Sequence, residues 1–207
     1  MKTVKIKSLT LNNYRCFSRE REFHAEFGKT TRISGRNGSG KSTVMNAFLE
    51  TLTGKNADGT QPDKIRPHDK NGVDIDRVDI IRELGLEIDG KPVTVTKKTA
   101  QKWRKPRGQS EEVFDGNKTS YSINGYDSDN QKEFQKWQEG IAEPDVLMMC
   151  SNARAFLNTV QKSTSEARKI LERMSGFKVE EFIAQNPEYA KIEELTKGHS
   201  VEDTLKQ

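Results

Sequence analysis

Apolar and polar residues alternate along several stretches of the chain, and a period of two residues predicts β-strands. The first stretch is 3–12, in which the apolar positions change parity between Ile6 and Leu9. A β-bulge near Ser8 would produce that change. Residues 19–27 predict a second strand, and the β-prone residues 30–34 predict a third.

A longer region of alternating residues covers 77–125. Its even-numbered apolar positions are Val78, Ile80, Leu84, Leu86 and Ile88. Asp89-Gly90 predicts a hairpin turn, after which Val93 and Val95 begin the return strand. Another hairpin is predicted from Val113-Phe114, Asp115-Gly116 and Thr119 to Ile123, ending at Asn124-Gly125. We therefore expect an antiparallel β insertion over about 77–125, preceded by an exposed polar loop at 55–77 with a possible short edge strand at 65–66.

Apolar residues recur at helical spacing in three places. Val44, Ala47, Phe48 and Leu52 predict a helix that stops at Gly54. Residues 131–141 predict a second helix, and residues 163–176 a third that ends at Gly176. The apolar run 146–149 is interpreted as a short buried strand, and the charged tail beyond 178 as helical.

Between the strand expected at 30–34 and the helix that follows it lies the segment GRNGSGKST, Gly35 to Thr43. It fits the phosphate-loop pattern G-x-x-x-x-G-K-[ST]. Glycines allow close approach of the backbone to a phosphate, and successive N–H groups at the start of a helix face the anion. Lys41 would reach the outer phosphates of a nucleotide, and the Ser42 hydroxyl would ligate Mg²⁺. The expected phosphate-binding residues are Gly35, Gly38, Ser39, Gly40, Lys41, Ser42 and Thr43.

Composition narrows the class of protein. The chain has 207 residues, 32% of them apolar and 32% charged, with 35 Lys and Arg against 31 Asp and Glu. Two cysteines far apart in sequence indicate neither a disulfide framework nor a zinc site. Neither a membrane-spanning apolar run nor a signal-peptide pattern is found in the sequence. We therefore expect a cytoplasmic protein.

Basic residues concentrate between positions 97 and 107, where no acidic residue interrupts them. Such a segment at a hairpin tip could contact the DNA backbone and release counterions from it. It could equally be a solvated hairpin end. The candidate DNA-binding residues are Lys97, Lys98, Lys102, Trp103, Arg104, Lys105 and Arg107.

The opening of the chain, from the first strand through N-Y-R-x-F to NGSGKST, resembles the amino-terminal head segment of SMC-like ATPases. That group includes the SMC, RecF, RecN and SbcC-type double-strand-break repair proteins. The resemblance implies that Asn37 lies beside the outer phosphate and that Arg15 lies near the base and inner phosphates. A solvated turn arginine is the competing interpretation of Arg15.

A second stretch, 150–177, is similar to SbcC-type heads through Phe156-Leu157, Arg168, Leu171 and Gly176. The family has a glutamine that senses Mg²⁺ before the F-L pair, and Cys150 stands in its place. Cysteine is a poor ligand for Mg²⁺, so Asn152 or a water would have to substitute. A small, buried apolar residue is the simpler interpretation of Cys150.

Two elements of a complete ATPase of this class are missing from the sequence: a Walker B strand and a serine-glycine-glycine signature motif. In SMC-like proteins both lie in a carboxy-terminal lobe. We therefore expect an α/β P-loop lobe of an ABC-type head with an antiparallel β subdomain at 1–178, and a helical segment at 179–207 leading to a coiled coil.

The resemblance implies ATP and Mg²⁺ as cofactors, and a carboxy-terminal lobe in the same or a partner chain. It also implies a head-to-head dimer, DNA association at the nucleoid, and a possible nuclease partner, with no membrane partner.

Two alternatives compete with this interpretation. One is a nucleotide-gated DNA-binding clamp without catalysis of its own. The other is a P-loop kinase or GTPase, although a GTPase should carry N-K-x-D and the chain has Asn117-Lys118-Thr119-Ser120.

Overall fold

The computed structural model describes residues 2–18, 21–69, 71–108, 110–128, 130–176 and 179–187. Its internal contacts divide the chain into two units, Met1–Thr164 and Ser165–Gln207. The first unit holds the sheet and the phosphate loop. The division falls before residue 178, where the sequence places the end of the lobe.

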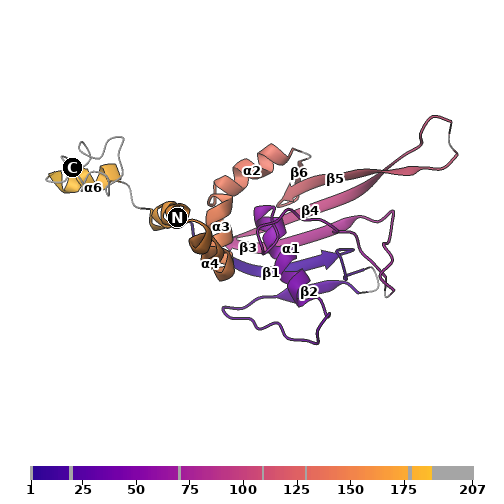
Figure 1. The fold of residues 1–207 in the computed structure, drawn as a ribbon, viewed down its shortest axis with the longest axis horizontal. Helices are drawn as coiled ribbons and strands as arrows, with labels where there is room; N and C mark the ends of the chain where they lie inside the picture. The colour runs from indigo at the N-terminus through magenta and orange to yellow at the C-terminus, as the bar shows by residue number, and fades with distance from the viewer. Residues whose placement is uncertain are drawn as a thin grey trace. The chain divides into compact units, whose positions relative to one another are not determined.

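The first unit is built on one six-stranded sheet in which every neighbouring pair of strands is antiparallel. The strand order is β2-β1-β3-β4-β5-β6, so the expected β insertion continues the sheet that β1 and β2 begin (Figure 1). The strands are β1 (Val4–Asn12), β2 (Phe23–Glu26), β3 (Ile80–Ile88), β4 (Lys91–Arg104), β5 (Val113–Ile123) and β6 (Tyr126–Ser128).

Several local features agree with the sequence pattern. The register between β1 and β3 shifts between Ile6 and Ser8, which confirms the predicted bulge. Asp89-Gly90 joins β3 to β4, and Asn124-Gly125 joins β5 to β6. Both turns place an Asp or Asn and a Gly at positive φ, the conformation these residue types adopt at least cost.

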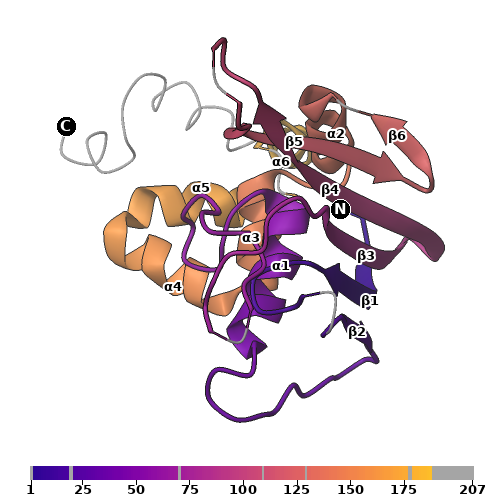
Figure 2. The same cartoon turned by 90° about the vertical axis from the view of Figure 1, so that its right-hand side faces the viewer.

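One face of the sheet is covered by α1 (Lys41–Thr53), which contacts β3 and β4 (Figures 1 and 2). The core between them takes alternate residues from the strands and the apolar stripe of the helix. Its fully buried members include Leu9, Leu11, Ala47, Leu49, Ile80, Leu84 and Val95. As predicted, α1 ends at Gly54, whose φ of 77° suits glycine.

Three further helices complete the first unit: α2 (Gln131–Glu139), α3 (Pro144–Ser151) and α4 (Ala153–Lys162). Helix α3 packs against α1, and α2 contacts β5 and β6. Beyond Thr164 lie α5 (Thr164–Ser175) and α6 (Val179–Gln185), and α5 stops before Gly176 as expected. Among the described helices, none has the length and apolar character needed to cross a bilayer.

Four sequence predictions are wrong. Residues 113–123 form one strand, β5, where a hairpin was expected. Residues 146–149 lie in helix α3, and residues 65–66 belong to no strand. Residues 30–34 also form no strand. The whole stretch 29–38 is exposed, and even the apolar Ile33 has 44% of its surface accessible to solvent. This stretch lies in the segment between β2 and α1, which loops away from the sheet in both views (Figures 1 and 2). A strand needs a neighbour to accept its hydrogen bonds, and the described residues provide none here.

Of the helical segment expected at 179–207, residues 179–185 form α6. Residues 188–207, together with any coiled coil, lie outside the described residues.

Candidate nucleotide-binding site

The phosphate loop lies at the amino-terminal end of α1. Gly40 precedes the helix with a φ of 98°, and its carbonyl accepts the first helical bond, from the Val44 N–H at 3.0 Å. The N–H groups of residues 41–43 therefore have no helical acceptor, as at every helix start. They sit at the positive end of the helix dipole, which favours a bound anion.

Lys41 folds back over the loop. Its ammonium donates to the carbonyls of Gly35 and Arg36, both at 2.8 Å. These bonds tie the two ends of the loop together around a charged group. A phosphate entering the loop would find this ammonium already beside the backbone that faces it, as the P-loop role of a lysine requires.

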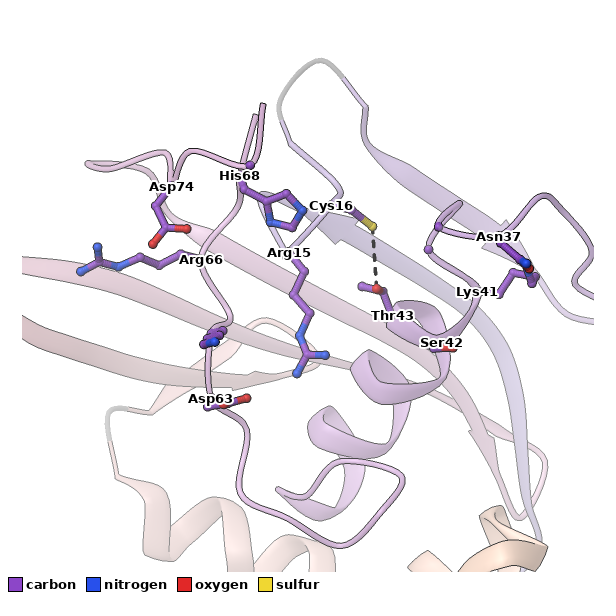
Figure 3. A pocket seen from close by; sticks show the side chains of 14 residues that line it. Arg15, Cys16, Asn37, Lys41, Ser42, Thr43, Asp63, Arg66, His68 and Asp74 are labelled. Carbon is purple, nitrogen blue, oxygen red and sulfur yellow. Dashed lines mark hydrogen bonds between the residues drawn. The ribbon is translucent and has the colours of Figure 1, made fainter. Parts of the chain in front are cut away.

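An open cleft of about 1020 Å³ adjoins the loop. Seven of the nine sequence-predicted nucleotide-binding residues line it: Arg15, Asn37, Gly38, Gly40, Lys41, Ser42 and Thr43. Gly35 and Ser39 complete the loop but are not among its lining residues. The opposite wall comes from the 63–74 loop, which Figure 3 shows across the cleft from Asn37 and Lys41. Sequence analysis treated that loop as solvent-exposed and missed its contribution of Asp63, Lys64, Arg66, His68, Gly72 and Asp74.

The turn that carries Arg15 connects the two walls. Asn13 and Arg15 both have a φ of 54°, so the chain reverses tightly around Tyr14. The backbone of Arg15 donates to Ile65 O at 3.2 Å and accepts from His68 N at 3.1 Å. Its guanidinium donates to Asn56 Oδ1 at 3.1 Å. Arg15 is therefore a half-buried part of the cleft wall, held by bonds from its backbone and its guanidinium.

The same turn also packs on the phosphate loop. A Cβ added to Gly40 would lie 2.8 Å from the Phe17 ring and 2.9 Å from Cys16 Sγ. The Cys16 thiol also lies 3.7 Å from Thr43 Oγ1. Only glycine therefore fits at position 40, for a steric reason as well as for its positive φ.

Ser42 fits a role as the protein ligand of Mg²⁺. It stands in the first turn of α1, lines the cleft and is exposed. Mg²⁺ prefers oxygen ligands and commonly takes few of them from protein, with phosphates and waters supplying the rest. A single serine hydroxyl beside a phosphate site is consistent with that coordination preference.

Asn152 does not fit the Mg²⁺ role that the sequence suggested for it. Its amide nitrogen donates to Ala57 O at 2.6 Å, and its oxygen accepts from Arg154 N at 3.1 Å. The side chain thus caps α4 and anchors the loop after α1. Cys150 lies in α3 rather than at a strand end, and it is exposed where we expected it to be buried.

The expected DNA-binding residues separate into two groups in the structure. Lys97 is only 12% exposed and faces Glu50, Lys98 pairs with Asp79 at 2.8 Å, and Arg104 pairs with Asp115 at 3.2 Å. Lys102, Lys105 and Arg107, here called the tip cluster, make no ion pair with any described residue. They lie at or near the tip of the β4–β5 hairpin, which extends beyond the rest of the sheet (Figure 1).

Trp103 is packed rather than presented to solvent. It meets Phe114 edge-on, with ring centroids 5.8 Å apart, and the guanidinium of Arg77 lies 4.5 Å from the centroid of its ring. These contacts brace the hairpin.

A buried charge cluster beneath α1 was not foreseen. Arg82 and Lys97 are directly opposite each other on β3 and β4, and both face Glu50 of α1. Arg82 donates to the Glu50 carboxylate and, at 2.6 Å, to Thr99. Burial and the adjacent Arg82 lower the pKa of Lys97 from 10.5 to about 8, although Glu50 opposes this change.

The fold and the site together define an α/β P-loop NTPase lobe with an antiparallel β subdomain, which confirms the predicted fold class. A family model described as an AAA domain matches residues 8–207, nearly the whole chain. The chain therefore belongs to the AAA domain family.

A solved structure shows the same fold. It comes from a study of ATP-driven dimerisation and DNA-stimulated activation of SMC ATPases, and it is 20% identical to this chain. The TM-score is 0.54, and the match covers 82% of this chain and 98% of the other. The chain thus has the fold of an SMC-like ATPase lobe, as its sequence indicated. A comparison with curated proteins finds no match.

Proposed function

We propose that this chain is the nucleotide-binding lobe of an SbcC-type ATPase that acts on DNA. The observation that carries the proposal is the phosphate loop at the start of α1, lining a cleft large enough for a nucleotide. The triphosphate would lie against residues 37–43, and the nucleoside would extend toward Arg15 and the 63–74 loop. Ser42 would hold Mg²⁺, which neutralises phosphate charge when bound.

Hydrolysis would depend on a second lobe. The carboxylates lining the cleft, Asp63 and Asp74, come from the far-wall loop, and neither follows an apolar strand as a Walker B acid would. The exposed 29–38 stretch supports the same idea, because its backbone would gain strand partners from a second lobe. ATP would then be held between two heads, and its binding would drive their engagement.

Association with DNA would use the tip cluster. Three cations without carboxylate partners among the described residues are suited to phosphate contacts, whereas the ion-paired Lys98 and Arg104 would first have to exchange partners. Double-strand-break repair, recombination and chromosome organisation are the processes that this combination fits. A nuclease partner and a location in the cytoplasm at the nucleoid belong to the same proposal.

Titration calorimetry with ATP and Mg²⁺ tests the binding step. The chain should bind ATP, and Lys41→Ala should abolish the heat of binding. Lys29→Ala, outside the cleft lining, is the matched control and should bind normally. Equal ATP affinity in the Lys41→Ala and wild-type chains would refute the proposal.

A turnover assay tests the need for a second lobe and separates the proposal from a non-catalytic clamp. The 207-residue chain alone should hydrolyse ATP poorly, whereas the chain combined with a carboxy-terminal lobe, in the same or a partner polypeptide, should hydrolyse it and respond to DNA. Robust Lys41-dependent turnover by the chain alone would show that no second lobe is needed. A two-lobe protein that binds ATP and DNA without turnover would identify a clamp.

A further inference from the structure

A buried hydrogen bond joins the Arg15 turn to the helix of the phosphate loop. The Tyr14 hydroxyl donates to Glu50 Oε2 at 2.7 Å. Tyr14 is fully buried and Glu50 is 2% exposed, so water does not compete for either group. Burial and the Glu50 carboxylate raise the pKa of Tyr14, which keeps the phenol protonated and able to donate.

The rest of the buried cluster fixes the acceptor of that bond. The other carboxylate oxygen of Glu50 accepts from Arg82, and Lys97 lies 3.6 Å from it. Arg82 is in turn held by Thr99. The carboxylate therefore has a defined position relative to both the sheet and α1, and Tyr14 is aligned with it.

The position of Tyr14 constrains that of Arg15, in addition to the bonds that Arg15 makes with Ile65, His68 and Asn56. Tyr14 and Arg15 are adjacent in a turn that is closed by bonds of 2.8 and 3.0 Å between the backbones of Tyr14 and Phe17. The positive φ values on both sides of Tyr14 leave this turn few alternative conformations. A displaced Tyr14 ring would carry the Arg15 guanidinium away from the cleft that it lines (Figure 3).

We propose that Glu50 is a positioning residue for the nucleotide: through Tyr14 it fixes Arg15 in the cleft at a set distance from the phosphate loop. This inference rests on the proposed function, because it assigns Arg15 a share of the nucleotide affinity. Glu50 touches no ligand itself. It aligns the Arg15 turn with helix α1, which carries the phosphate loop, at the buried point where the two meet.

A double-mutant cycle tests the inference. Arg15→Ala should weaken ATP binding by the full chain, and Tyr14→Phe should weaken it about threefold to tenfold, which is a fraction of the roughly tenfold to hundredfold worth of a buried hydrogen bond to a charged acceptor. In the Arg15→Ala background, Tyr14→Phe should have no further effect, because the residue that it positions is gone. A role confined to stability would not produce this coupling.

Thr51→Val is the matched control. It removes a buried hydroxyl of α1 that donates to Ala47 O at 2.7 Å and not to the Glu50 cluster, so it should lower stability and leave ATP affinity unchanged.

Two results would overturn the inference while leaving the proposed function intact. One is wild-type ATP affinity in Tyr14→Phe, and the other is the same factor of loss from Tyr14→Phe with and without Arg15. A wild-type chain that does not bind ATP would instead overturn the proposed function, and this inference with it.

Discussion

Replacing Lys97 by methionine should make the protein more stable at neutral pH. The cluster beneath α1 holds two cations, Arg82 and Lys97, against the single carboxylate of Glu50. Lys97 is the less favourable of the two cations to keep charged, because burial and the adjacent guanidinium both disfavour its ammonium form. Methionine fills a similar volume without the charge.

The magnitude follows from the pKa. The pKa of Lys97 lies near 8 in the folded protein, compared with 10.5 for an unperturbed lysine in the unfolded chain. Each pH unit corresponds to about 1.4 kcal/mol, so keeping the amine protonated at pH 7 costs roughly 3 kcal/mol of stability. We therefore expect Lys97→Met to raise the free energy of unfolding by up to about 3 kcal/mol.

The sign of the pH dependence distinguishes this cause from simple repacking. Between pH 8 and 10.5 the unfolded chain keeps a proton on Lys97 that the folded chain has released, so wild-type stability should rise with pH in this window. Above pH 10 the raised pKa of Tyr14 acts in the opposite direction, because the unfolded tyrosine ionises first. Measurements at pH 7 to 9.5 isolate the lysine.

Urea unfolding monitored by tryptophan fluorescence at four pH values is the assay. Wild-type stability should increase from pH 8 to 9.5, whereas that of Lys97→Met should stay flat. Lys98→Met is the control, because Lys98 is on the exposed face and pairs with Asp79. That variant should change stability by less than about 1 kcal/mol and keep the wild-type pH dependence. A destabilised Lys97→Met, or one with an unchanged pH slope, would refute the reasoning.

Three further outcomes can be checked. Lys41→Met should lower ATP affinity at least tenfold in calorimetry, since it removes the only side-chain ammonium that the loop itself holds; a smaller loss would place the phosphates elsewhere. Gly40→Ala should lower the free energy of unfolding by about 2 to 4 kcal/mol, from a positive φ and two close contacts, whereas Gly59→Ala, at a similar φ with open space, should lose about 1 kcal/mol. Equal losses would mean that the contacts at Gly40 relax. Neutralising the tip cluster should reduce the salt dependence of DNA binding by about two to three counterions, measured by fluorescence anisotropy, and an unchanged slope would exclude the hairpin.

Local patterns predicted the phosphate loop and most of the sheet, because both depend on neighbours in sequence. The spacing of the phosphate-loop residues placed Lys41 and Ser42 at the start of a helix. The change in parity of the apolar positions located the bulge near Ser8. The same logic failed for residues 146–149, since a short apolar run fits a buried strand or a buried helix equally well. Pro144 was the neglected signal, because proline at the first turn of a helix is common.

The sequence contains a sign of the buried charges, in the parity of two charged positions on β3 and β4. The even-numbered apolar positions of β3 skip Arg82, which indicates that its side chain faces the core with its neighbours. Lys97 likewise follows Val93 and Val95 in the same parity on β4. Glu50 left no comparable sign, because it lies beside the apolar stripe of its helix. Its partners come from strands more than thirty residues away.

The uncovered backbone before the phosphate loop should affect the affinity of the loop for ATP. Residues 29–38 precede the helix without a neighbouring strand among the described residues, so the curvature of the loop is set from one side only. Whatever packs on the other side would change how well the loop fits a triphosphate. If the proposed second lobe packs there, ATP would saturate the joined lobes at concentrations that leave the isolated chain only partly occupied.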